Sequence, residues 1–159
     1  MGDSTKRSDR PRKFFSTDEQ TQIVQAIKGA EKRTSGEIRC HVERDVPRKE
    51  PAAGNPYQRA RQLFEKLGMH ATESRNGVLI YLATRSRSFA VLGDEELHLK
   101  VGDDFWRDIA ATMTSHFKED RFADGMAGGI REIGEKLEKY FPYQADDVNE
   151  LPDEISFED

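Results

Sequence analysis

The chain has 159 residues, which is the length of one domain that can bury roughly two thirds of its unfolded surface. Charged residues make up 35% of it and the net charge is -5, with a basic lead at residues 1–13 and an acidic tail at residues 142–159. The stretch between them, residues 14–141, is close to neutral and lacks the basic stripe that nucleic-acid binding requires. We therefore predict a folded domain at residues 14–141, disordered ends, and no nucleic-acid partner.

The sequence also indicates where in the cell the protein is expected. No apolar stretch approaches the ~18 residues of a membrane span, and the first residues lack the apolar core of a signal peptide. We expect no membrane span, a cytoplasmic location and a monomer. Cys40 is the only cysteine, which excludes an internal disulfide and a cysteine-based metal site.

The first predicted element is a helix over residues 17–33. Ser16 and Glu19 have the spacing of a capping box, and apolar residues recur behind them at helical spacing. Residues 37–43 then alternate polar and apolar, which is typical of a strand that is half buried in a sheet.

A second helix and two strands are predicted in the middle of the chain. Apolar residues at helical spacing indicate a helix over residues 57–67, and Gly68 is suited to end it. Residues 78–83 and 89–92 are short apolar runs rich in β-branched and aromatic residues, joined by a polar turn. We interpret them as a hairpin.

Two more helices are predicted after the hairpin, one over residues 103–117 and one over residues 122–141, each with an apolar stripe. A helix between the first two strands indicates a parallel crossover, whereas the tight turn after the second strand indicates an antiparallel pair. The order of elements predicts an α/β fold with a mixed sheet and helices on both faces.

Acidic residues follow the last predicted strand in two clusters, Gly93-Asp94-Glu95-Glu96 and Gly102-Asp103-Asp104. Binding sites of open α/β sheets usually lie where strands end, and carboxylates and backbone carbonyls are the ligands that calcium prefers. We predict a divalent-cation site, for Ca²⁺ with Mg²⁺ as competitor. The first-choice ligands are Asp94, Glu95 and Asp103, and the second-choice ligands are Glu37, Asp104 and Asp124. The alternative is that these acids are helix-start residues and a solvated face.

Two other functions remain open. The chain lacks the phosphate-binding loop of nucleotide hydrolases, the serine elbow of hydrolases and the histidine pair of zinc proteases. A metal-assisted phosphatase is one alternative, with Arg85 or Arg87 neutralising the phosphate and with no catalytic residue assigned. A protein-interaction module that uses the charged tails to bind an unknown partner is the other.

Four short motifs together resemble the TPM domain family. They are the helix start at Thr17, the stretch 34–38 leading into the first strand, the strand 76–81, and the stretch 117–129. That family is named for a thylakoid lumen acid phosphatase, a photosystem II repair protein and a nematode levamisole-receptor modulator. The resemblance covers residues 15–140 and implies a three-layer α/β/α sandwich with a Rossmann-like mixed sheet of about four strands. It also implies weak acid phosphatase activity, as in some members, or calcium binding in an acidic cleft, as in others.

One departure from the family pattern bears on the choice between these activities. Many members follow the third strand with a Gly-Tyr-Gly run, whereas this chain has Gly93-Asp94-Glu95-Glu96. The extra carboxylates attract a cation and repel a phosphate ester. The departure therefore favours cation binding, in what resembles a soluble, stand-alone member of the family.

Overall fold

The computed structural model of the protein describes residues 7–144 and 151–158. Its described strands form one four-stranded sheet in the order β3-β2-β1-β4. Their bounds are β1 Glu37–Glu43, β2 Gly77–Ala83, β3 Ser88–Gly93 and β4 Ser156–Glu158. β1 is parallel to β2 and to β4, and β3 is antiparallel to β2, so the sheet is mixed as predicted.

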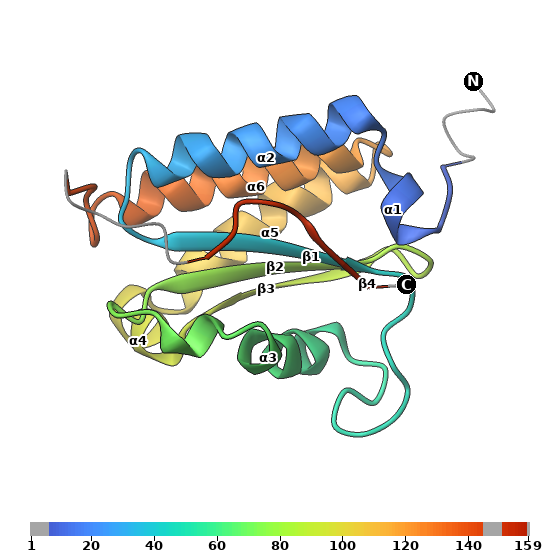
Figure 1. The fold of residues 1–159 in the computed structure, drawn as a ribbon, viewed down its shortest axis with the longest axis horizontal. Helices are drawn as coiled ribbons and strands as arrows, with labels where there is room; N and C mark the ends of the chain where they lie inside the picture. Colours follow the sequence, from blue (N-terminus) through green and yellow to red (C-terminus); the bar gives the residue numbers. More distant parts are fainter. Residues whose placement is uncertain (1–6, 145–150, 159) are drawn as a thin grey trace.

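Helices cover both faces of this sheet (Figure 1). The helices α2 (Thr17–Glu31), α5 (Asp103–Phe117) and α6 (Phe122–Leu137) pack on one face, and α3 (Pro56–Lys66) with the short helix η2 (Met69–Ala71) packs on the other. Two short helices complete the set, α1 (Pro11–Phe14) and α4 (Glu95–Val101). The predicted three-layer sandwich is thus confirmed.

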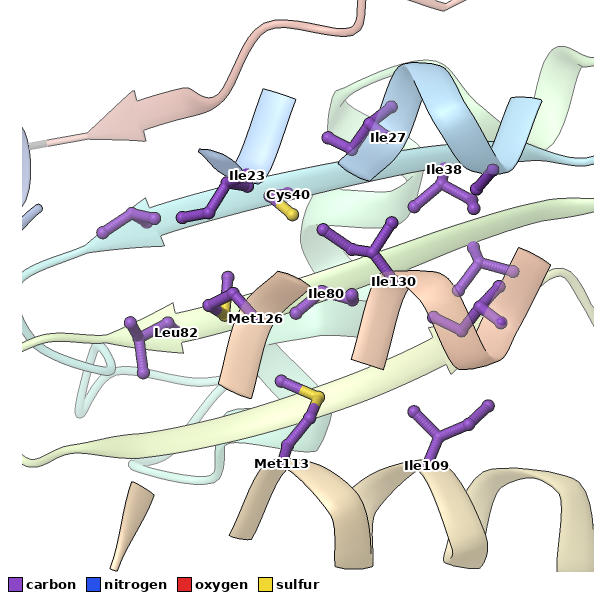
Figure 2. Packing of buried hydrophobic residues seen from close by; sticks show 14 of the residues in the cluster. Ile23, Ile27, Ile38, Cys40, Ile80, Leu82, Ile109, Met113, Met126 and Ile130 are labelled. Carbon is purple, nitrogen blue, oxygen red and sulfur yellow. The ribbon is translucent and has the colours of Figure 1, made fainter. Parts of the chain in front are cut away.

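The larger core lies between the sheet and the layer of three helices (Figure 2). Alternate residues of β1, such as Ile38 and Cys40, face this layer, and Ile130 of α6 is fully buried in the same cluster. The helices of the layer approach each other closely. A Cβ added at Gly134 of α6 would lie 2.7 Å from the Cβ of Ala30 in α2, so glycine is needed for this packing.

The structure contains the capping box and the first strand that the sequence predicted. Ser16 accepts a hydrogen bond from the Glu19 amide while the Glu19 side chain accepts one from the Ser16 amide, which is the predicted capping box. α2 ends at Glu31, two residues before the predicted end. β1 spans Glu37–Glu43, as predicted.

The ends of the chain differ from the prediction. The helix α1 (Pro11–Phe14) begins inside the lead of residues 1–13, which was expected to be disordered. Residues 156–158, in the expected disordered tail, form β4 on the edge of β1, and Leu151 is 8% exposed in the smaller core with α3. An edge strand offers unpaired backbone groups to any nearby segment, so a few apolar residues in an acidic tail suffice to fix it there. Residues 1–6, 145–150 and 159 lie outside the described part of the chain.

Among the described residues no helix combines the length and the apolar character needed to cross a membrane.

Candidate functional site

A pocket of about 1090 Å³ lies along β3, which is a terminal strand of the described sheet. α3 forms one wall, and α4 with the start of α5 forms the other. Both apolar and charged side chains line it: Pro51, Tyr57, Gln58, Arg61, Gln62, Phe64, Glu65, His70, Arg75, Val91, Leu92, Gly93, Asp94, Glu95, His98, Leu99, Asp103 and Trp106.

The position of this pocket corrects one step of the sequence argument. The acidic clusters follow the carboxyl end of β3, but β3 runs antiparallel to β2, and the amide of Asp94 donates to the carbonyl of Gly77 at the start of β2. The site therefore lies at the amino ends of the parallel strands. The rule that binding sites lie at the carboxyl ends of strands holds for parallel strands. It therefore does not predict the position of this pocket.

Asp94 is a buried capping residue of the pocket wall, with 1% of its surface exposed. Its Oδ1 accepts a hydrogen bond of 3.0 Å from the amide of Glu96, which caps the amino end of α4. Its Oδ2 accepts a hydrogen bond of 2.9 Å from Nε of Arg75. The hydrogen bond to Asp94 raises the pKa of Arg75. Both carboxylate oxygens of Asp94 therefore have partners, with lone pairs to spare.

Glu95 and Asp103 are the exposed carboxylates of the same wall. Oδ1 of Asp103 lies 3.3 Å from Nε2 of His98, so these two side chains pair on the wall of the pocket. The three first-choice ligands of the sequence prediction thus line one pocket, although they do not converge on a single point in the structure as it stands.

Trp106 closes the inner end of this wall. Its indole lies directly over Gly93, where any Cβ would overlap the ring, and it packs edge-to-face on Phe105 with ring centroids 4.6 Å apart. Nε1 of Trp106 is buried, with no hydrogen-bond partner in the described part of the chain. Trp106 therefore packs against the larger core and also lines the pocket.

The second-choice ligands lie elsewhere. Glu37 is buried at the start of β1 and accepts a hydrogen bond of 2.8 Å from the amide of Leu151. Asp104 points to solvent and pairs with Arg107. Asp124 lies in the first turn of α6, and Leu137 at the other end of that helix lies against Gly36, just before β1. The two ends are about 20 Å apart along the helix axis. Asp124 accepts a hydrogen bond from Gln22 of α2.

The arginines considered for a phosphatase also lie away from the pocket. Arg85 pairs with Asp9 and Asp45 beside the hairpin turn, and the guanidinium of Arg87 lies 4.8 Å from the ring centroid of Phe122. The turn is at the opposite end of β3 from Gly93. Arg61 and Arg75 are the arginines that line the pocket.

A second constellation was missed by the sequence reasoning. In the part of the chain that the structure describes, His41, Glu43 and Glu158 form the one group whose possible ligand atoms all lie within 4.8 Å of one another. His41 and Glu43 are two residues apart in β1 and therefore lie on the same face of the sheet, as the sequence pattern already indicated. Glu158 comes from the tail that was expected to be disordered, so no local signal placed it there.

Acidic side chains also cluster where the tail crosses the start of β1. Burial, a hydrogen bond with Asp153 and the nearby charge of Glu37 raise the pKa of Glu31 to about 9. The Glu31 carboxyl is therefore protonated near neutral pH and can donate to the Asp153 carboxylate.

The fold and pocket together define a three-layer α/β/α domain with a polar pocket beside its terminal strand β3. The chain matches the family model described as the TPM domain over residues 9–136. The protein therefore belongs to the TPM domain family.

Solved structures agree with this assignment. The BA42 protein of the psychrophilic bacterium Bizionia argentinensis is 39% identical with a TM-score of 0.83, and the match covers 91% of this chain and 96% of that one. An N-terminal domain from P. gingivalis is 16% identical with a TM-score of 0.64, covering 80% of this chain and 78% of that one. The N-terminal domain of cg2496 from Corynebacterium glutamicum is 14% identical with a TM-score of 0.59, covering 77% and 74%. These last two show the fold alone. A search of curated proteins gave no significant match.

Proposed function

We propose that this TPM domain binds a divalent cation, with Ca²⁺ as the first candidate, on the acidic wall of the pocket. The observation that carries the proposal is that Asp94, Glu95 and Asp103 line the same pocket. Glu95 and Asp103 are exposed at the starts of α4 and α5, where a small change of side-chain rotamer brings their oxygens toward an ion. Water and backbone carbonyls complete the six to eight oxygens that calcium takes.

The contact of Arg75 with Asp94 supports this proposal, because it shows that the Asp94 carboxylate attracts a positive charge at this position. Its Nε lies 2.9 Å from Oδ2 of Asp94, and its side chain is 44% exposed. A guanidinium with that exposure has room to turn into solvent when an ion takes over the charge of the buried Asp94 carboxylate. We infer that Arg75 neutralises the acidic wall in the absence of the ion and is displaced by it.

The experiment is calorimetric titration of the metal-free protein with Ca²⁺, with Mg²⁺ as competitor. Two neighbouring variants form a matched pair: Asp103→Asn removes a pocket carboxylate, and Asp104→Asn removes an exposed carboxylate that faces solvent beside it. Saturable binding that Asp103→Asn weakens and Asp104→Asn leaves intact supports the proposal. Absence of heat together with an unchanged melting temperature in Ca²⁺ would contradict it, because a bound ion stabilises the folded state.

A metal-assisted phosphatase is the second candidate, favoured by one observation: Arg61 and Arg75 line the same pocket as the acids. A guanidinium beside a metal ion is suited to bind a phosphoryl group and neutralise its charge. Hydrolysis of a simple aryl phosphate should then fall in Arg61→Gln and stay unchanged in Arg85→Gln, whose side chain lies at the far end of β3. Equal activity in both variants would assign the hydrolysis to a contaminant.

A further inference from the structure

β4 brings two polar side chains onto the face of β1 that carries His41 and Glu43. In register, His41 is opposite Ser156 and Glu43 is opposite Glu158. His41 also stacks on Tyr81 of β2, with ring centroids 6.3 Å apart. The residues therefore lie between a firmly held sheet strand and the last described residues of the chain.

The imidazole of His41 has one nitrogen engaged and the other unused. Nδ1 lies 2.8 Å from the hydroxyl oxygen of Ser156, while Nε2 has no hydrogen-bond partner in the described chain although His41 is only 2% exposed. Nε2 faces Oε1 of Glu158 at 3.5 Å. Burial lowers the pKa of His41. When Nδ1–H donates to Ser156, the lone pair of Nε2 points at the glutamate.

The two carboxylates are held by neighbouring donors and keep coordination capacity. Glu43 accepts hydrogen bonds of 2.7 and 3.0 Å from Arg59 and of 2.6 Å from the hydroxyl of Tyr81. These use three of its roughly four lone-pair positions and leave one on Oε1. Arg59 and Lys66 approach Oε2 of Glu158, which leaves its Oε1 toward His41.

We propose that His41, Glu43 and Glu158 form a site for a divalent transition-metal ion of the zinc type, which fastens β4 to β1. A neutral imidazole with two carboxylates is a donor set that suits Zn²⁺ or Co²⁺, whereas calcium prefers oxygen ligands alone. A water molecule supplies the fourth position.

The surrounding side chains act as supports for these ligands. Ser156 holds the ring of His41 in place through Nδ1, and Arg59 with Tyr81 fixes the orientation of Glu43, as outer partners do in metal sites. Arg59 also neutralises the glutamate charge when no ion is bound. Glu158 is the one ligand on the terminal strand, so an ion at this site ties the position of β4 to the presence of metal.

The test is calorimetric titration of the untagged, metal-free full chain with Zn²⁺, and with Co²⁺ for its absorption spectrum. We expect saturable binding, a tetrahedral Co²⁺ spectrum, and affinity at least about tenfold weaker in His41→Gln and in Glu158→Gln. His98→Gln is the matched control, because His98 lies in the other pocket and is exposed. Its Zn²⁺ affinity should equal that of the wild type.

A second readout follows the strand itself. Zn²⁺ should slow removal of residues 151–159 by a carboxypeptidase in the wild type and have no effect in Glu158→Gln. The proposal is overturned if Zn²⁺ and Co²⁺ show no saturable binding, or if binding survives in both ligand variants. Should His41→Gln fail to fold, Glu158→Gln decides the outcome, because that side chain is 37% exposed on the last described strand.

The zinc site and the calcium pocket can fail separately. Asp103→Asn should weaken Ca²⁺ binding and leave Zn²⁺ binding unchanged, whereas Glu158→Gln should weaken Zn²⁺ binding and leave Ca²⁺ binding unchanged.

Discussion

The amide of Leu151 donates a hydrogen bond of 2.8 Å to Oε1 of Glu37, a carboxylate that is 5% exposed at the start of β1. This contact ties the C-terminal segment to the sheet across 114 residues of sequence. A buried carboxylate without such a donor costs free energy, so the tail contributes to the fold on which it rests. The stability of the domain should therefore depend on residues beyond the last helix.

Leu151→Ala tests that dependence. Leu151 is 8% exposed and belongs to the smaller core with Leu63 and Leu79, so its truncation should lower the free energy of unfolding by about 2 kcal/mol. Leu99→Ala is the matched control, since Leu99 is 80% exposed and its loss should change stability by less than about 0.5 kcal/mol. Urea unfolding measures both. Equal stability of the two variants would mean that the tail packs without stabilising the domain.

The pH dependence of stability should report on Glu31. Its folded pKa of about 9 lies above the unfolded value of 4.5, so the folded state holds an extra proton between these limits. The stabilisation is complete below pH 4.5 and is lost as the pH rises toward 9. Buried His41, whose pKa is lowered from 6.5, acts in the opposite direction and only toward acid pH. The melting temperature should thus fall from pH 7 to about 9 in the wild type and stay flatter in Glu31→Gln. Parallel curves for both proteins would rule out Glu31 as the cause.

The elements that the sequence predicted are those with strong local signals. The capping box at Ser16 and Glu19 and the alternation along β1 each depend on residues close together in the chain, and the structure contains both. α4 was missed because its 7 residues are too few to establish a period. The sequence argument assigned Asp94 only the role of a ligand, because the capping role depends on a helix that had not been predicted.

The site was predictable only in part, for a topological reason. Asp94, Glu95 and Asp103 are near one another in sequence, so one pocket could collect them. Grouping Asp124 with them depended on which end of α6 lies near the start of β1, and in the structure that end is Leu137 rather than Asp124. The cluster with Glu158 depends on β4, whose pairing with β1 is long-range and leaves no periodic pattern in 3 residues.

Two substitutions of Asp94 should distinguish its role in capping α4 from its role as a charged ligand. Asp94→Ala removes the acceptor for the Glu96 amide and should destabilise the domain by about 1 kcal/mol. Asp94→Asn keeps a good capping side chain, so its stability should stay close to that of the wild type while its calcium affinity falls. Thermal unfolding with and without Ca²⁺ measures both quantities. If Asp94→Asn binds Ca²⁺ as tightly as the wild type, Asp94 serves α4 and is no ligand.

Because α2 packs closely against α6, substitution of alanine for two glycines in these helices should change the stability of the domain in opposite directions. A Cβ at Gly134 would lie 2.7 Å from the Cβ and 3.0 Å from the Cα of Ala30, so Gly134→Ala should destabilise by about 1–3 kcal/mol. Gly29, inside α2, has nothing within 4 Å of the added Cβ. Gly29→Ala should therefore stabilise by about 0.5–1 kcal/mol through helix propensity. Chemical unfolding of the two variants side by side checks the sign of each. Destabilisation by Gly29→Ala would show a contact on the outer face of α2.

Arg75 gives the most discriminating test of the calcium pocket, because here a deletion should improve binding. Nε of Arg75 lies 2.9 Å from Oδ2 of Asp94, so an ion on that carboxylate competes with the positive charge of the guanidinium. Arg75→Gln removes the competing charge, so Ca²⁺ should bind severalfold more tightly, with the gain shrinking at high salt as the competing charge is screened. Arg107→Gln is the control, since Arg107 pairs with Asp104 in solvent and should leave the affinity unchanged. Weaker Ca²⁺ binding in Arg75→Gln would mean that Arg75 holds the wall in shape for the ion, and unchanged binding would place the ion away from Asp94.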